Sequence, residues 1–401
     1  MEQFEMLKNL PLSGITVLEI GIIVSAPTAG LILSDLGANV LKIENVVGGD
    51  PNRENSGAPG TGQFDFLNRN KHSISLNLKS TEGREIFLKI AKGADVIIEN
   101  LSPGSVESLG IDFDNIVKIN SKIIYCSIKG FGNGVFSNRK MTDYPAQAES
   151  GLAYMTGLKN RPMRAGASVL DMMAANMVVI SILAALYKNT SNGIRKSEKV
   201  TVGMFETGAF LVAPVISRFF QNYEIPMPLN EVSFRWSVYD FFSLNDGRKI
   251  FLGIINENQW DRFVQKYDIP DLRKDKFSTN ESRLRHREEL LEILQNFILT
   301  KNPEELVEEL SKSDLLFAFL NRPDQLIQHP HLSPKMLEYN SYVGQNKKIR
   351  LPTLPIESSN YTYSVRHSAP KLGEWTYEIL KQLGYSSEQI TQLKAKHIVN
   401  F

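Results

Sequence analysis

A single acidic residue, Asp171, stands at the start of the one long apolar segment of the chain. It lies in Gly166-Ala-Ser-Val-Leu-Asp-Met-Met-Ala-Ala-Asn176, and the sequence stays apolar almost without a break to Tyr187. Aspartate is a favoured N-cap because its oxygen accepts hydrogen bonds from the first free backbone N–H groups, and the helix dipole favours its charged form. We therefore expect Asp171 to cap a long buried helix. A charged, partly desolvated carboxylate in that place is also equipped to attack an acyl carbon.

An ordinary helix cap with no chemical role fits the same pattern. In either case asparagine caps about as well as aspartate, so Asp171→Asn should change stability little. If Asp171 is only a cap, the substitution should also leave any activity unchanged.

Sequence motifs for several other chemistries are absent. The first apolar strand is followed by Gly21-Ile-Ile-Val-Ser-Ala-Pro27, which is not a dinucleotide fingerprint, and there is no GxxxxGK[ST] loop. There is also no GxSxG and no HExxH motif. His329 and His331 are closely spaced but have no acidic ligand cluster nearby, and Cys126 is the one cysteine. We expect no metal site, no disulfide and no permanently bound cofactor.

Composition bounds the class of protein. A chain of 401 residues suggests two or three domains, and 42% apolar with 22% charged residues is ordinary for a globular protein. The formal net charge of +1 does not point to nucleic acid or to a membrane surface. Residues 1–8 lack the features of a signal peptide, and the apolar run 172–187 is short for a membrane span. We expect a soluble, cytoplasmic protein.

The elements that must position Asp171 alternate between strands and helices. Strands are predicted at 15–20, 39–43, 95–98 and 122–128, with helices at 28–36 and 80–92. Such alternation indicates an α/β fold with a Rossmann-like parallel sheet covered by helices. Ligands bind beyond the carboxyl ends of the strands in these sheets, here the loops 21–27, 44–53, 99–104 and 129–134.

The second half of the chain changes character. Residues 190–202 are polar and turn-rich, which suggests a boundary, and 204–221 read as one apolar helix. Short strands at 238–242 and 249–255 and helices at 257–266, 283–299 and 303–312 indicate a smaller α+β domain at 225–330. Residues 330–358 are Pro-rich and irregular, and helices follow at 374–383 and 387–394. We expect a large domain formed by 1–200 together with a return linker and C-terminal part at 335–401.

A series of short landmarks carries a family resemblance. They are Leu12-Ser-Gly-Ile-Thr-Val-Leu-Glu, Leu36-Gly-Ala-Asn-Val-Leu-Lys-Ile-Glu44, Gly48-Gly-Asp-Pro-Asn-Arg53, Asn70-Lys-His-Ser-Ile-Ser-Leu-Asn-Leu-Lys79, Ala94-Asp-Val-Ile-Ile-Glu-Asn100, Gln147-Ala-Glu-Ser-Gly151, Asp275-Lys-Phe-Ser-Thr-Asn-Glu-Ser-Arg283 and Leu372-Gly-Glu-Trp-Thr-Tyr-Glu-Ile-Leu380. In this order and spacing the chain resembles the class III CoA-transferase family, which includes formyl-CoA:oxalate CoA-transferase. The resemblance covers about Pro11 to Leu393.

The resemblance implies a mechanism. The family's catalytic aspartate falls on Asp171, whose carboxylate would attack the thioester of an acyl-CoA donor to give a mixed anhydride and then an aspartyl-CoA thioester. A carboxylic acid acceptor would then take up the CoA. The substrates would thus be a CoA thioester and a free acid. The family also implies an interlocked homodimer, with each chain threaded through its partner.

The resemblance also places the CoA contacts. They fall on Val24 and Ser25, on Leu76, Asn77, Leu78 and Lys79, on Asn100, Leu101 and Ser102, and on residues 128–131 with Lys129, Gly130 and Phe131. Relatives carry arginines where this chain has Asn45 and Ser108, so weaker CoA binding is expected. The basic residues available for phosphates are Lys42, Arg53, Lys71, Lys79 and Lys129.

Two other functions stay open at this point. The same fold houses α-methylacyl-CoA racemases, which pair the aspartate with a histidine one residue before Asp143. That position is Thr142 here, which cannot act as a base at neutral pH. The other alternative is a non-catalytic acyl-CoA-binding paralogue. The family's glycine-rich substrate loop falls on 252–260 and keeps one glycine, Gly253, so the sequence does not predict oxalate as the substrate.

Overall fold

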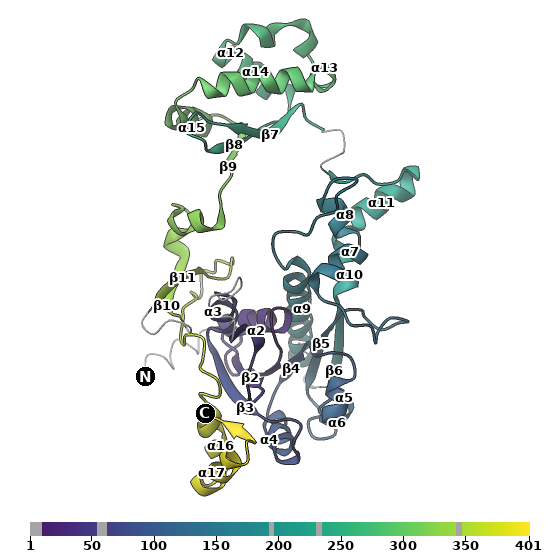
Figure 1. Cartoon of the computed structure of the whole chain (residues 1–401), viewed down its shortest axis with the longest axis vertical. Coiled ribbons are helices and arrows are strands. Elements are labelled where there is room, and N and C mark those ends of the chain that lie inside the picture. The colour runs from purple at the N-terminus through teal and green to yellow at the C-terminus, as the bar shows by residue number, and fades with distance from the viewer. Residues whose placement is uncertain (1–9, 54–61, 192–195, 230–234, 342–346) are drawn as a thin grey trace. The chain divides into compact units, whose positions relative to one another are not determined.

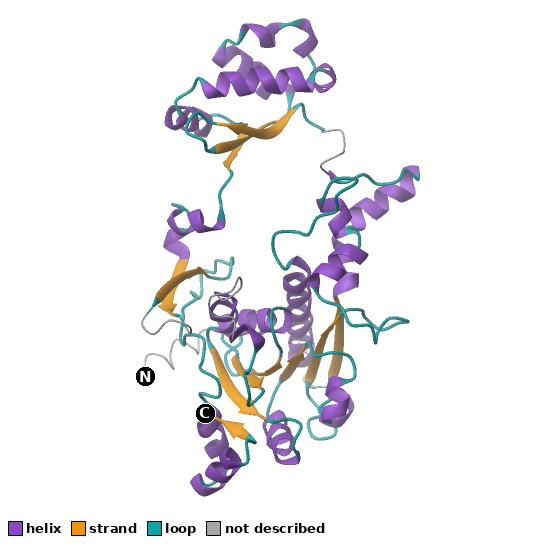
Figure 2. Ribbon diagram, viewed as in Figure 1, coloured by secondary structure: helices purple, strands orange, loops and turns teal. Residues whose placement is uncertain are grey.

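The computed structural model describes residues 10–53, 62–191, 196–229, 235–341 and 347–401. The chain forms two compact units, one from Met1–Asn230 with Lys335–Phe401 and one from Glu231–Pro334. Figure 1 labels the helices and strands, and Figure 2 separates them by type.

A mainly parallel sheet forms the centre of the large unit. Within the described residues it has seven strands in the order β12-β3-β2-β1-β4-β5-β6, and β12 alone runs antiparallel to its neighbour β3. The strands are β1 (Thr16–Ile20), β2 (Asn39–Glu44), β3 (Lys71–Leu76), β4 (Val96–Glu99), β5 (Ile124–Lys129), β6 (Glu198–Gly203) and β12 (Val399–Asn400). The predicted α/β fold with a Rossmann-like sheet is confirmed.

Both faces of this sheet are covered because the strands are apolar on both sides. On β1, Val17 packs into the core under α2 (Ser25–Asp35) and α9 (Val169–Ser191), whereas Leu18 packs into the core on the opposite face. That opposite core is shared by α4 (Thr81–Ala91), α5 (Ser105–Leu109), α6 (Phe113–Ile116), α16 (Thr376–Gln382) and α17 (Ser387–Ala395). Side chains in strands alternate between faces, so each strand contributes to both cores.

The strand order creates a crevice. The first strand, β1, lies between β2 and β4. The chain adds β2 and β3 on one side of β1 and then places β4, β5 and β6 on the other side. The loops that follow β1 and β4 therefore diverge at the carboxyl edge of the sheet. This is the position at which doubly wound sheets bind ligands.

Three predictions for local structure in the large unit are wrong. Residues 198–203 form the edge strand β6, because pairing with β5 supplies the hydrogen bonds that this polar segment does not signal by itself. The expected helix at 204–221 is two helices, since Pro214 lacks the N–H that a continuous helix needs. The expected irregular linker contains the hairpin of β10 (Met336–Asn340) and β11 (Lys348–Pro352). The remaining helices of this unit are α3 (Gly62–Asn68), α7 (Asp143–Glu149), α8 (Leu152–Thr156), α10 (Met204–Leu211) and α11 (Ala213–Asn222).

The helix α9 was expected to be buried, and it is buried on one face only. Ala174, Val178 and Ile182 are fully buried against the sheet, whereas Ile180 and Tyr187 are 58% and 76% exposed. Among the described helices, α9 alone passes a test of length and composition for crossing a membrane, over Val169–Asn189. One face of this helix packs on the sheet, and 39% of the apolar window tested is buried in the single chain.

The small unit has its own core. Its sheet has the antiparallel order β7 (Val238–Ser243), β8 (Lys249–Ile254) and β9 (Leu316–Phe319). Its α-helices are α12 (Glu257–Tyr267), α13 (Asn280–Arg285), α14 (Arg287–Leu299) and α15 (Pro303–Ser311). The predicted single helix at 283–299 is wrong, because His286 interrupts the helical backbone between α13 and α14. Phe242, Trp260 and Leu294 are among the side chains of this core.

Candidate active site

A cavity of about 230 Å³ opens at the carboxyl ends of β1, β4 and β5. It brings Asp171 together with predicted CoA contacts from three loops, namely Val24, Ser25, Asn100, Leu101, Ser102, Lys129 and Gly130. It also has lining residues that the sequence did not single out as contacts, including Arg139, Lys140, Thr142 and Met204. Arg139 and Lys140 lie in the polar stretch after β5, which was their one available signal, whereas Thr142 was noted only as the position of a racemase base.

Asp171 is the third residue of α9 and does not cap it, so that prediction is wrong. The cap comes from Asp143 on α7, whose Oδ1 accepts hydrogen bonds from the backbone N–H groups of Leu170 (2.8 Å) and Asp171 (3.3 Å). Because another residue satisfies these donors, the side chain of Asp171 is left to line the cavity. No local pattern signals a cap supplied from 28 residues away.

The environment raises the pKa of Asp171 to about 6. Burial is the largest cause and the negative charge of Asp143 is the second, while a hydrogen bond with the Ser25 side chain and the charge of Arg164 oppose the rise. The stabilisation of the charged form that a helix N-terminus implies is therefore outweighed here. A carboxylate with this pKa is still largely ionised at neutral pH and is more basic than an ordinary aspartate, which suits a nucleophile.

Asn100 fixes the loop that carries Ser25. Its Nδ2 donates to the carbonyl oxygen of Ile22 and to the hydroxyl oxygen of Ser25, both at 2.9 Å, and its Oδ1 accepts from the Ile22 N–H at 2.9 Å. Because the Ser25 oxygen already accepts from Asn100, its own proton is free to be donated to Asp171. Asn100 thus positions both the wall of the cavity and the hydroxyl beside the carboxylate.

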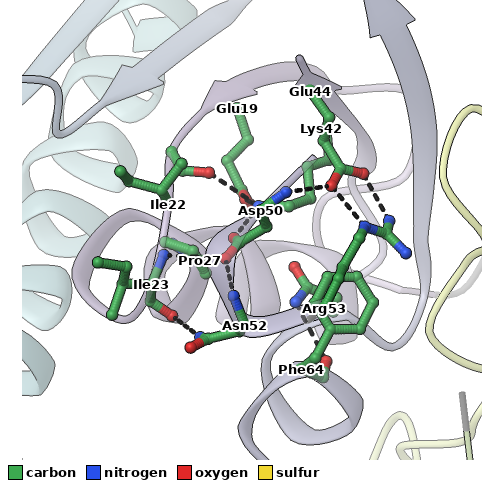
Figure 3. A network of polar contacts seen from close by, with 12 residues as sticks. Glu19, Ile22, Ile23, Pro27, Lys42, Glu44, Asp50, Asn52, Arg53 and Phe64 are labelled. Carbon is green, nitrogen blue, oxygen red and sulfur yellow. Dashed lines mark hydrogen bonds and ion pairs between the residues drawn. The ribbon is translucent and has the colours of Figure 1, made fainter. Parts of the chain in front are cut away.

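Ile23, which follows Ile22 in the same loop, has a left-handed backbone with φ of +67°. This conformation is strained for a β-branched residue. Asp50 and Asn52 hold it from the other side, since Asp50 Oδ1 accepts from the Ile23 N–H at 3.3 Å and Asn52 Nδ2 donates to the Ile23 carbonyl at 2.7 Å. Figure 3 shows both residues meeting the loop.

The support behind this loop is a buried network of charges under α2 (Figure 3). Lys42 is fully buried and contacts Glu19 and Asp50, each at 2.9 Å, and the Gly21 carbonyl at 2.8 Å. Lys71 is also fully buried and lies 2.6 Å from Glu19. Gly30 allows α2 to approach so closely, because a Cβ there would lie 1.9 Å from the Glu19 carboxylate.

The charges in this network are not available to a ligand. Lys42 and Lys71 are held by carboxylates, and Arg53 donates to both carboxylate oxygens of Glu44 at 2.6 and 2.7 Å. The prediction that these three residues are available for phosphates is wrong, because sequence shows their charge but not their burial. Burial also lowers the pKa of Lys71 to about 8, despite the attraction of Glu19.

Lys129 and Phe131 lie differently from the other predicted contacts. Lys129 lines the cavity, but its ammonium group contacts Glu99 Oε1 and Oε2 and the Leu101 carbonyl oxygen, each at 2.8 Å. Phe131 is buried against Phe136 and Phe205 and lines a separate polar cavity of about 150 Å³. In the single chain, these contacts give Lys129 and Phe131 a structural role.

A larger cavity of about 490 Å³ adjoins the first, since both are lined by Ile22 and Leu101. It holds the predicted contacts Asn45, Leu76, Asn77, Leu78 and Lys79, together with His397, which the sequence did not point to. Ser108 lines neither cavity, and its hydroxyl donates to the Ser105 carbonyl within α5. In the described part of the chain, no three His, Cys, Asp or Glu side chains gather as a metal would require.

The charge of Asp143 leads to a prediction about pH. Asp143→Asn removes the negative charge that helps to raise the pKa of Asp171, so the activity that depends on ionised Asp171 should begin at lower pH than in the wild type. The variant should also be less stable, because Gln147 Nε2 donates to Asp143 Oδ2 at 2.7 Å and an amide nitrogen cannot accept. The measurement is kcat/KM against pH, and a rising limb that stays near pH 6 would contradict this account.

Comparison with known proteins covers nearly the whole chain. A family model described as CoA-transferase family III matches residues 12–376. The chain is 30% identical to a protein named acyl-CoA transferase from Fusarium pseudograminearum, across 97% of this chain and 88% of that protein. It is also 30% identical to the human succinyl-CoA:glutarate CoA-transferase, across 99% and 92% of the two chains. The crystal structure of a CAIB/BAIF family protein from Brucella suis superposes with a TM-score of 0.84 at 26% identity, covering 94% of this chain and all of that one.

Proposed function

Because this chain belongs to CoA-transferase family III, we propose that it transfers CoA from an acyl-CoA donor to a carboxylic acid through a covalent intermediate on Asp171. The resemblance seen in the sequence is confirmed at the level of the family, and the protein is a transferase. The observation that supports the role of Asp171 is its position: a half-buried carboxylate with a raised pKa lines a cavity that three strand-end loops form.

The proposed reaction proceeds in balanced steps. A carboxylate oxygen of Asp171 attacks the thioester carbonyl carbon, the carbon–sulfur bond breaks, and CoA leaves as the thiolate while a mixed anhydride forms. The thiolate then attacks the Asp171 carbonyl carbon of the anhydride, which releases the donor acid and leaves an aspartyl-CoA thioester. The acceptor carboxylate repeats these steps in reverse. Each intermediate stays activated, so transfer needs no other energy source.

The side chain of Ser25 has a place in these steps. Its hydroxyl hydrogen-bonds with the Asp171 carboxylate, and Asn100 fixes its oxygen at 2.9 Å. A hydrogen-bond donor held in this way aligns the carboxylate before attack. It also stabilises the negative charge as that charge moves from the carboxylate to the thioester oxygen. The remainder of CoA would extend into the adjoining 490 Å³ cavity.

The acids themselves are proposed only as a class. Named relatives include succinate–glutarate CoA-transferase of Agrobacterium fabrum and (R)-2-hydroxy-4-methylpentanoate CoA-transferase of Clostridioides difficile, at 28% and 29% identity. Lys140 lines the Asp171 cavity and offers a cation to a carboxylate substrate, whereas Arg139, which also lines it, is bound to Glu149 at 2.8 Å. Arg164 lies 3.3 Å from Asp143 and is paired with it. A panel of acyl-CoA donors and free acids, with mass spectrometry of the products, would identify the pair.

The racemase alternative requires a second base beside Asp171. Thr142 lines the cavity where that base would stand, and no histidine is among the described residues that line it. Exchange of the α-proton needs both an acid and a base in place. The arrangement therefore favours transfer over racemisation.

Trapping the intermediate tests the proposal. The enzyme is incubated with an acyl-CoA donor and no acceptor, quenched, treated with hydroxylamine and digested. We expect a hydroxamate on the peptide that contains Asp171, and no such product without the donor. A hydroxamate on another carboxylate would overturn the assignment. Exchange of an α-proton with solvent in place of any adduct would support a racemase.

We propose further that the enzyme works as an interlocked homodimer. Apolar side chains are exposed on α9, α10 and α11 of the single chain, among them Ile180, Phe210, Ile216 and Phe220. Patches of this kind commonly mark protein interfaces. Threaded chains separate only after substantial unfolding, so the dimer should persist on dilution. Mass photometry at nanomolar concentration checks this, and a reversible monomer would contradict interlocking.

A further inference from the structure

His397 occupies a backbone position that suits glycine. It follows α17 directly after the C-cap Lys396 and has a φ of +54°. Its N–H donates to the Lys394 carbonyl and the next N–H donates to the Leu393 carbonyl, both at 2.9 Å. These two bonds define the Schellman ending of a helix, in which the left-handed residue is usually glycine. A strained histidine in such a place suggests a role for its side chain.

The fold carries this residue to the substrate edge of the sheet. The terminal strand β12 is antiparallel to β3, with Val399 opposite Leu76, and the Asn77 N–H donates to the Ile398 carbonyl at 2.8 Å. The start of β12 therefore meets the carboxyl end of β3. As a result, His397 lines the 490 Å³ cavity together with Asn45, Asn77 and Lys79.

The charges around this cavity leave His397 and Lys79 as its basic groups. Glu44 and Asp50 also line it, and each is bound to a buried cation. On α17, Lys394 Nζ donates to the Phe401 carbonyl at 2.7 Å and Lys396 Nζ to Glu82 at 3.4 Å. Asn45, which also lines the cavity, is neutral. A strongly anionic ligand here would meet His397 and Lys79 first.

We propose that His397 and Lys79 together bind a phosphate group of CoA in this cavity. This inference rests on the proposed function. An imidazole N–H and a lysine ammonium both donate to phosphate oxygens. The tail of the chain thus contributes a specificity-determining contact from more than 300 positions after the loop that it joins.

Substitution by glycine separates binding from folding. In His397→Gly the left-handed backbone is retained without strain, so the melting temperature should stay the same or rise. The affinity for CoA, measured by titration calorimetry, should nevertheless fall about tenfold or more, which is the usual scale of one hydrogen bond to a charged group. A structural role alone would not weaken binding while leaving stability intact.

A matched control and truncated ligands complete the test. Asp268→Gly makes the same change at the left-handed C-cap of α12, at φ of +48°, and should leave CoA affinity unchanged. The loss in His397→Gly should vanish with pantetheine, which has no phosphate. If it also vanishes with dephospho-CoA the contact is to the 3′-phosphate, and if it persists the contact is to the diphosphate. An equal loss with pantetheine, or no loss with CoA, would overturn the proposal. Wild-type protein that binds no CoA at all would instead refute the proposed function.

Discussion

Replacing Asp171 with asparagine is expected to lower the rate of CoA transfer by about 10⁴-fold or more, the scale seen when a covalent nucleophile is removed. Asparagine has nearly the same shape, but its amide oxygen does not form the anhydride. Steady-state transfer measured with a mass-spectrometric product assay gives the ratio directly. A folded variant that retains wild-type turnover would remove Asp171 from the mechanism.

The same substitution should make the protein more stable at neutral pH. The pKa of Asp171 is raised from 3.8 to about 6 in the folded protein, so the stability associated with its protonated form is complete below pH 4 and is lost as pH rises through 6. Asparagine cannot ionise and avoids this loss, which amounts to about 1–3 kcal/mol above pH 6. Melting temperatures of both proteins at pH 4 and pH 7 test the sign. This replaces the expectation of unchanged stability, which assumed that Asp171 is a cap.

Asp112→Asn provides a matched control for Asp171→Asn. Asp112 is the true N-cap of α6, where its side chain accepts from the N–H groups of Asp114 and Asn115. Asparagine caps about as well as aspartate, so both stability and activity should be nearly unchanged. If Asp112→Asn matched Asp171→Asn in either assay, the special position of Asp171 would be in doubt.

Replacing Lys42 with methionine should cost about 3–5 kcal/mol of stability, because it leaves the buried Asp50 carboxylate without its cation and Glu19 with Lys71 alone. Lys42 is fully buried between Glu19 and Asp50 and also donates to the Gly21 carbonyl. Methionine fills much of the same volume but neutralises neither charge. The measurement is the denaturation midpoint by circular dichroism, in the wild type and the variant under the same conditions.

Two further variants identify the cause of that loss. Lys348→Met removes an exposed cation that pairs with Glu338, and it should leave the stability nearly unchanged. Adding Asp50→Asn to Lys42→Met removes one orphaned charge and keeps an oxygen for the Ile23 N–H, so it should recover part of the stability. No recovery would mean that lost packing, rather than unpaired charge, explains the effect of Lys42→Met.

The sequence by itself determined the local elements of the sheet and singled out Asp171 as the candidate nucleophile. Apolar runs such as 15–20 and 39–43 predict strands because a sheet covered on both faces buries every side chain. The isolation of Asp171 before an apolar segment singled it out without any knowledge of its neighbours. Two strands that form only by pairing with distant segments gave no such signal. The polar segment of β6 depends on pairing with β5, and β12 has only two residues.

The tertiary structure alone decided what the charged residues do. The sequence indicated Lys42 and Lys71 as cations available for phosphates, whereas folding places both in the interior beside Glu19. Asp171 read as a cap, whereas Asp143 takes that part and its charge helps to raise the pKa of Asp171. The physical reason is common to these cases: periodicity encodes which face of an element is apolar, whereas desolvation and ion pairing depend on groups that only the folded chain brings within a few ångströms.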